Sequence, residues 1–241
     1  MKKIIVDNVS LQFRMYHDGS SSIKEYFANF FGKKKRKYTD FLALQGVSFS
    51  VNDGERLGIV GRNGAGKSTL LRTISRIYEP TVGHIEALGR VAPLLDIGAG
   101  FHPEFTGREN IYYNGAFLGY SKEQLREIEN EVIEFAELEE FIDTPVKYYS
   151  TGMYMRLAFS LATTVHPDIL ILDELFVGGD ASFVKRGKER MNKMIDRSSV
   201  MILASHDASL LSSVCDRYIW LDHGKLIADG DASVLDAYCA S

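Results

Sequence analysis

The chain has 241 residues, of which 45% are hydrophobic and 25% charged, and its formal net charge is −4. This length is sufficient for one domain with a large buried core, and the mildly acidic balance gives no reason to expect nucleic-acid binding. The two cysteines, Cys215 and Cys239, lack metal-ligand spacing, and no secretory leader is evident, which fits a reducing cytosol. No run of about 18 apolar residues predicts a membrane span.

The first predicted elements are strands at residues 3–6 and 9–16, and a strand resumes at residues 42–49. Between them, residues 17–40 form a long excursion in which apolar and aromatic residues recur every three or four positions. This spacing predicts a short amphipathic helix, followed by five basic residues at 33–37. From periodicity alone, this helix could equally pack on its own domain, and a basic run is usually a solvated loop.

Residues 61–69 read Gly-Arg-Asn-Gly-Ala-Gly-Lys-Ser-Thr and lie between an apolar run at 57–60 and the apolar start of a helix at 70–74. The succession of strand, glycine loop and helix is the P-loop pattern, in which backbone N–H groups and the helix start hold phosphates. Lys67 would reach the β- and γ-phosphates, and Ser68 would ligate Mg²⁺. The alternative is an ordinary glycine turn. The predicted phosphate-binding residues are Gly61, Asn63, Gly64, Ala65, Gly66, Lys67, Ser68 and Thr69.

Helix-forming residues with apolar spacing predict helical structure over residues 121–143, without any strand signal. A second helical stretch follows at 154–162, preceded by Tyr-Ser-Thr-Gly-Met at 149–153. Ser150 is a good N-cap residue for that helix, and a helix start with a hydroxyl and a glycine is equally an anion site.

Residues 169–172 are apolar and predict a buried parallel strand that ends at two carboxylates, Asp173 and Glu174. Ligands of open α/β sheets bind at this edge, so Asp173 is predicted to hold Mg²⁺ and Glu174 to orient or deprotonate a water molecule. Seen alone, two acids after a strand would be a solvated turn. Another apolar strand is predicted at 200–204, just before His206, and residues 224–230 predict a final turn and strand.

This order of motifs resembles that of ATP-binding cassette (ABC) ATPases, and the match covers nearly the whole chain. The resemblance implies an α/β fold, namely a P-loop NTPase of the ABC nucleotide-binding type with a RecA-like core, an antiparallel β subdomain and a helical subdomain at about 100–165. It implies one domain over 1–241, ATP and Mg²⁺ as cofactors, and ATP hydrolysis with Lys67, Glu174 and His206 as catalytic residues. It further implies a head-to-tail homodimer with ATP between the subunits. Contacts to the nucleotide would then come from Ser150 and Gly152 across the interface, from His206 at the γ-phosphate, and from Asp180 in the D-loop.

The sequence departs from the family pattern at three places. The signature has Tyr149, Thr151 and Met153 where Leu-Ser-Gly-Gly-Gln is usual, and Gly-Gly-Asp at 178–180 replaces the common Ala-Leu-Asp. No Q-loop glutamine occurs within 91–110, so Asp96 is the nearest candidate for a residue approaching the metal. The aromatic residue that stacks on adenine would be Phe13 or Tyr16, either of which could equally belong to the core.

The glycine-rich segment at 94–110 and the Tyr-Ser-Thr-Gly-Met signature are similar to those of cassettes that export polysaccharides such as O-antigen, capsule and teichoic acid. The excursion at 17–40 then resembles a gate helix facing an integral-membrane permease subunit, present in two copies, with a lipid-linked polysaccharide passing near the basic residues. That resemblance implies a peripheral location at the cytoplasmic face of the inner membrane. The chain ends 35 residues after His206, which leaves no room for a C-terminal carbohydrate-binding domain and indicates a short form or a truncated protein.

Other functions remain open from the residues. The chain could serve a different membrane transporter, or it could be a soluble cassette ATPase that acts on ribosomes or DNA. Proteins of that second class carry two cassettes or a long coiled coil between the P-loop and the signature, and neither occurs here. A P-loop kinase is a third alternative, against which the signature and His206 argue.

Overall fold

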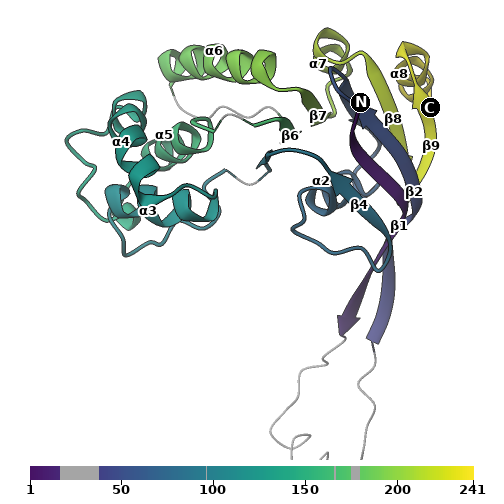
Figure 1. Cartoon of the computed structure of the whole chain (residues 1–241), viewed down its shortest axis with the longest axis horizontal. Helices are drawn as coiled ribbons and strands as arrows, with labels where there is room; N and C mark the ends of the chain where they lie inside the picture. Colours follow the sequence, from purple (N-terminus) through teal and green to yellow (C-terminus); the bar gives the residue numbers. More distant parts are fainter. Residues whose placement is uncertain (17–37, 96, 166, 175–179) are drawn as a thin grey trace, which may run out of the picture.

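A computed structural model describes residues 1–16, 38–95, 97–165, 167–174 and 180–241. The predicted gate helix, the basic residues at 33–37 and Asp96 therefore lie outside the described residues, as does the side chain of Tyr16. Figure 1 shows two lobes: a core lobe that contains the strands, and a helical arm formed by α3, α4 and α5.

The smaller sheet is antiparallel and has the order β2-β1-β4. It consists of β1 (Lys2–Tyr16), β2 (Tyr38–Asn52) and β4 (Val82–Ala87). The two segments predicted at 3–6 and 9–16 are one strand, interrupted by a register shift next to Asn8, whose φ is +47°. The strand β2 begins at Tyr38, so residues 38–40, predicted to lie in the excursion, are strand residues instead.

The larger sheet has the order β5-β6-β7-β3-β8-β9 and is parallel except for β9. Its strands are β3 (Arg56–Val60), β5 (Val91–Leu94), β6 (Ile169–Asp173), β7 (Val200–Ala204), β8 (Arg217–Asp222) and β9 (Lys225–Gly230). The residues of β6 and β7 are apolar almost without interruption because both faces of these central strands are buried. Since β3, β6 and β7 are parallel, their carboxyl ends meet at one edge of the sheet.

Helices cover this sheet: α2 (Lys67–Ile74), α6 (Ala181–Arg197), α7 (Ala208–Val214) and α8 (Ala232–Cys239). The helix α8 was not expected, because the residues were predicted to finish with a strand at 224–230. Asp231 caps α8 by accepting from the Ser233 N–H at 3.1 Å, and Tyr238 packs edge-on against Trp220 of β8.

The helical arm contains α3 (Gly107–Phe117), α4 (Lys122–Ala136), the 3₁₀ turn η1 (Val146–Tyr148) and α5 (Thr151–Ala162). It has its own apolar cluster, formed by residues such as Ile111, Val132 and Leu157. The predicted helical stretch at 121–143 ends earlier, at Ala136, because Glu137 adopts a left-handed conformation with φ +54°.

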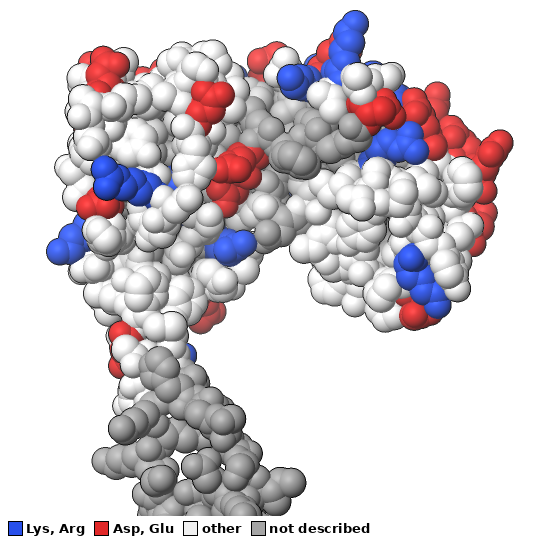
Figure 2. Space-filling view, turned by 180° about the vertical axis from the view of Figure 1, so that it is seen from behind, with Lys and Arg blue, Asp and Glu red and all other residues white. Residues whose placement is uncertain are grey.

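Figure 2 shows acidic side chains gathered along the outer edge of the arm, and a hollow between the arm and the core lobe. The exposed acids of the arm from α4 onward are Glu123, Glu127, Glu131, Glu134, Glu137, Glu139, Glu140 and Asp143. Among the described residues, no helix combines the length and the apolar character needed to cross a bilayer.

Candidate functional site

A cavity of about 400 Å³ lies at the carboxyl edge of the larger sheet, where β3 and β6 end and β7 leads into α7. This is the edge at which parallel α/β sheets bind ligands. The structure brings together here all the predicted phosphate-binding residues except Gly61, and both acids and the histidine. The lining residues are Phe41, Ala43, Asn63, Gly64, Ala65, Gly66, Lys67, Ser68, Thr69, Asp173, Glu174 and His206.

The loop between β3 and α2 is shaped by its glycines. Gly61, Gly64 and Gly66 have φ values of +154°, +80° and +105°, which side chains disfavour. Gly66 is the N-cap residue of α2 and has no side chain that could accept from the first turn. The helix start therefore leaves N–H groups available for an anion at the cavity.

Lys67 supplies the positive charge of the cavity. Its Nζ donates to the carbonyl oxygen of Gly61 at 2.7 Å and to that of Arg62 at 3.3 Å, and the residue is only 8% exposed. Burial lowers the pKa of Lys67, while the negative charges of Asp173 and Glu174 oppose that shift. The ammonium group is thus held over the phosphate loop and close to both acids.

The acids and the histidine meet because β6 and β7 are neighbours in the sheet. Asp173 is the last residue of β6, opposite Ala204 of β7. The N–H of Glu174 donates to the Ala204 carbonyl at 2.9 Å, and its φ is +59°. This turn brings Glu174 Oε1 to 3.3 Å from Nε2 of His206, with both side chains about half exposed. An exposed carboxylate held by an imidazole can bind and orient a water molecule.

The donor set fits Mg²⁺ bound together with phosphates. A hydroxyl from Ser68 and a carboxylate from Asp173 line one cavity. Within the described ranges, no group of three or more His, Cys, Asp or Glu side chains could form an all-protein metal cage. Mg²⁺ at nucleotide sites is held by one or two protein groups, phosphate oxygens and water, which matches this arrangement.

The aromatic residue beside the cavity is Phe41, and sequence reasoning missed it. Phe13, the first choice for stacking on adenine, packs edge-on against Tyr78 with ring centroids 5.3 Å apart and is not among the cavity-lining residues. Phe41 pairs with Phe13 across the β1–β2 ladder, is 49% exposed and lines the cavity. An aromatic residue upstream of the glycine loop is the signal that could have identified Phe41. It was missed because residue 41 lies between the predicted excursion and the strand predicted to start at 42.

The predicted signature residues lie in the arm and not among the residues that line this cavity (Figure 1). Ser150 is the N-cap residue of α5, and its Oγ accepts from the Met153 N–H at 3.2 Å. Gly152 has open space where a Cβ would be, with the Ser150 Oγ nearest at 3.9 Å. Asp180 is the N-cap residue of α6, and the hydrogen bond from the Phe183 N–H is foremost in lowering its pKa.

The sequence model of the family described as ABC transporter matches residues 44–177, which is more than half of the chain. This chain belongs to the ABC transporter family. Solved structures confirm the predicted ABC fold. An ATP-binding subunit of an ABC transporter superposes with a TM-score of 0.70 at 21% identity, covering 98% of this chain and 93% of that one. A dimeric ATP-binding cassette in a post-hydrolysis state, bound to ADP and phosphate, gives 0.67 at 20% identity, covering 95% and 98%.

Relatives within the ABC family are more similar in sequence. The O-antigen export system ATP-binding protein RfbB of Klebsiella pneumoniae is 39% identical, over 96% of this chain and 95% of that protein. RfbE of Yersinia enterocolitica, which carries the same description, is also 39% identical, over 94% and 97%. RfbB of Myxococcus xanthus is 44% identical over 86% of this chain, which spans only 47% of that longer protein.

Proposed function

We propose that this chain is the ATP-hydrolysing subunit of an ABC exporter that moves a lipid-linked polysaccharide, of O-antigen, capsule or teichoic acid type, across the cytoplasmic membrane. The convergence of the P-loop, Asp173, Glu174 and His206 on one cavity carries the ATPase part. The similarity over almost the full length of the Klebsiella and Yersinia export proteins supports the polysaccharide part.

Each residue has a separate task in this proposal. Lys67 and the glycine-loop N–H groups hold the phosphates, and Phe41 offers an aromatic face to the base. Mg²⁺, held by Ser68 and Asp173, supplies charge stabilisation when bound. Glu174 orients the attacking water for in-line displacement, and His206 holds Glu174 and reaches toward the γ-phosphate.

The site of a single copy is incomplete in this proposal. Ser150, Gly152 and Asp180 lie outside the lining of the cavity of their own chain, so they act on the nucleotide of a second copy in a head-to-tail dimer. The N–H groups at the start of α5 then face the γ-phosphate from the opposite side. Hydrolysis removes the group that joins the two halves, and the dimer relaxes.

A permease subunit in the membrane would receive this motion, which places the chain peripherally at the cytoplasmic face. The arm offers a surface for that contact at α3, where Tyr113 is 41% and Phe117 is 74% exposed. Their rings pack edge-on with centroids 5.1 Å apart, and the ring of Phe105 packs edge-on against that of Tyr113. Exposed aromatic groups of this kind are typical of protein interfaces. The predicted gate helix, outside the described residues, would add to this contact.

The variant Glu174→Gln tests the catalytic assignment. It keeps the shape of the side chain, so ATP binding and ATP-dependent dimerisation should persist while kcat falls about 10²- to 10⁴-fold, as for loss of a general base. Phosphate release and light scattering measure the two properties. Glu139→Gln, on the acidic edge of the arm, is the control and should behave like the parent. Turnover at the parent rate would contradict the role of Glu174, and full-speed hydrolysis by a strict monomer would contradict the dimer.

The cargo is tested in cells. Deletion of the gene should abolish polysaccharide at the cell surface and leave it inside, and the parent chain, but not Glu174→Gln, should restore export. Normal surface polysaccharide in the deletion strain would contradict the export assignment and leave the ATPase assignment unaffected.

A further inference from the structure

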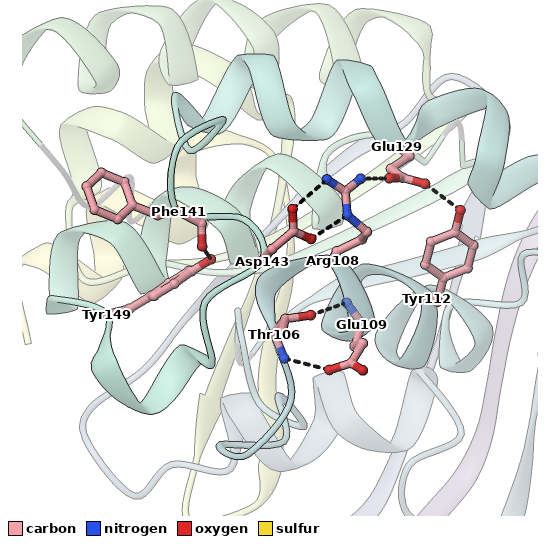
Figure 3. Close-up of polar contacts among 8 residues, drawn as sticks. All are labelled: Thr106, Arg108, Glu109, Tyr112, Glu129, Phe141, Asp143 and Tyr149. Carbon is pink, nitrogen blue, oxygen red and sulfur yellow. Dashed lines mark hydrogen bonds and ion pairs between the residues drawn. The ribbon is translucent and has the colours of Figure 1, made fainter.

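Tyr149, the residue directly before Ser150, is hydrogen-bonded to the loop that precedes η1. Its hydroxyl donates to the carbonyl oxygen of Phe141 at 2.8 Å, in the loop between α4 and η1 (Figure 3). The ring is half-buried against the apolar cluster of the arm. Burial first, and then the nearby charge of Asp143, raise the pKa of Tyr149 to about 12, so the phenol is a neutral donor under physiological conditions.

The Tyr149 hydroxyl group packs closely against the start of α3, at Gly107. A Cβ on Gly107 would lie 2.4 Å from the Tyr149 hydroxyl oxygen and 2.9 Å from Cδ1 of Ile142. The absence of a side chain at Gly107 therefore lets the ring approach the helix start. Real Cβ atoms do not occur at such distances, so alanine at this position would push the phenol away.

The start of α3 is itself held in place by several hydrogen bonds. Thr106 and Glu109 form a reciprocal capping box at the start of α3, with bonds of 3.1 and 2.8 Å (Figure 3). Arg108 pairs with Asp143 through two bonds and also contacts Glu129 of α4. The guanidinium thereby ties α3, α4 and the loop that carries the Phe141 carbonyl into one unit.

The backbone at Tyr149 is short and extended between two helical elements. Its N–H donates to the Val146 carbonyl at 3.0 Å, closing η1, and Ser150 immediately begins α5. We propose that Tyr149 is a positioning residue: its bond to the Phe141 carbonyl keeps Ser150 at the place from which it meets the nucleotide of the second copy. This inference rests on the dimer of the proposed function.

Tyr148 provides a matched control. It is 70% exposed, and its ring contacts the Lys147 ammonium at 5.2 Å. Replacing either tyrosine by phenylalanine removes one hydroxyl from adjacent positions, but only Tyr149→Phe removes the bond to Phe141.

The test uses Glu174→Gln as the parent, so that ATP is retained and dimerisation is measured directly. At saturating ATP, adding Tyr149→Phe should raise the protein concentration for half-maximal dimerisation about tenfold, since one neutral hydrogen bond, worth about a factor of three, is lost at each of two signatures. Adding Tyr148→Phe should change nothing. ADP binding to the monomer should be unchanged in all variants, because the P-loop lies in the other lobe. With Glu174 intact, Tyr149→Phe should raise the apparent KM for ATP and leave kcat at saturation close to the parent value.

Each other outcome is decisive. If Glu174→Gln alone does not dimerise with ATP, the dimer of the proposed function is wrong, and the positioning role of Tyr149 in that dimer is wrong with it. If it dimerises and Tyr149→Phe matches Tyr148→Phe, the positioning role is wrong. A loss of monomeric ADP binding equal to the loss of dimerisation would also overturn the proposal, because it would indicate general damage. Gly107→Ala, which displaces the phenol while retaining its hydroxyl, should reproduce the dimerisation defect. Normal dimerisation of that variant would contradict the claim that the Tyr149 phenol must pack against Gly107.

Discussion

Replacing Gly61 by alanine should destabilise the protein far more than replacing Gly64, although both glycines belong to the same loop. Both have φ values in the left-handed region, +154° and +80°. A Cβ on Gly61 would lie 2.3 Å from the carbonyl oxygen of Leu221 in β8 and 3.0 Å from the Ala65 Cβ. A Cβ on Gly64 would meet nothing within 4 Å.

The two costs can be worked out from this difference. Left-handed backbone costs alanine about 1–2 kcal/mol, and the loss of glycine's freedom in the unfolded chain offsets about 0.4–1 kcal/mol of that. Gly64→Ala should therefore lower the free energy of unfolding by about 0.5–1 kcal/mol. Gly61→Ala adds an overpacking cost of about 1–3 kcal/mol, because a backbone contact cannot be relieved by a rotamer change, for a total of about 1.5–4 kcal/mol.

Urea unfolding without nucleotide measures these values, provided that the m-values agree. ATP affinity should distinguish the two variants in a second way. Gly64 faces open space in the cavity, so a methyl group at this position would meet the phosphates. Gly64→Ala should thus lose ATP affinity with little loss of stability. Equal destabilisation by both substitutions would refute the reasoning from the Leu221 carbonyl.

Three further results are expected. Phe41→Ala should raise the KM for ATP at least about fivefold, as for loss of a stacked base, and leave binding of inorganic triphosphate unchanged. The control Phe117→Ala should change neither the KM nor triphosphate binding. An unchanged KM in Phe41→Ala would exclude Phe41 as the base contact. Burial, with a smaller contribution from Asp216, raises the pKa of Cys215 from 9.0 to about 12. Between these values the unfolded chain loses its proton first, so the stabilisation present at lower pH should diminish as the pH rises from 9.0 toward 12, and Cys215→Ala should reduce that slope. At pH 8, a thiol reagent followed by mass spectrometry should modify the exposed Cys239 and spare the buried Cys215 until urea is added; rapid labelling of both would show that Cys215 is accessible.

Local patterns were sufficient where the chemistry depends on residues that are close along the chain. The glycine loop at 61–69 combines its turn, its helix start and its lysine within nine residues, so its spacing alone indicates a phosphate site. The strands β6 and β7 were predictable for a similar reason, since burial on both faces requires a continuous apolar run. Ser150 was correctly predicted as a cap because capping is a contact between residues three positions apart.

Other features depend on contacts between distant segments, which no local pattern contains. Phe13 and Phe41 are both aromatic strand residues, and only the folded sheet brings Phe41 to the cavity while Phe13 packs on Tyr78. The helix α8 was missed because its apolar pattern is weak, and the helix is stabilised instead by packing of Tyr238 against Trp220.

The sequence by itself determined that this protein has a phosphate loop, two acids after a buried strand and a capped signature helix, because these depend on spacing within one segment. Only the tertiary structure decided which of them share a cavity. The parallel order of β6, β7 and β3 places Asp173, Glu174 and His206 beside Lys67, and the arm keeps Ser150 outside the lining of that cavity. Strand order and lobe arrangement arise from burial of apolar surface between residues far apart in the chain, and the information for that pairing is spread over the whole sequence.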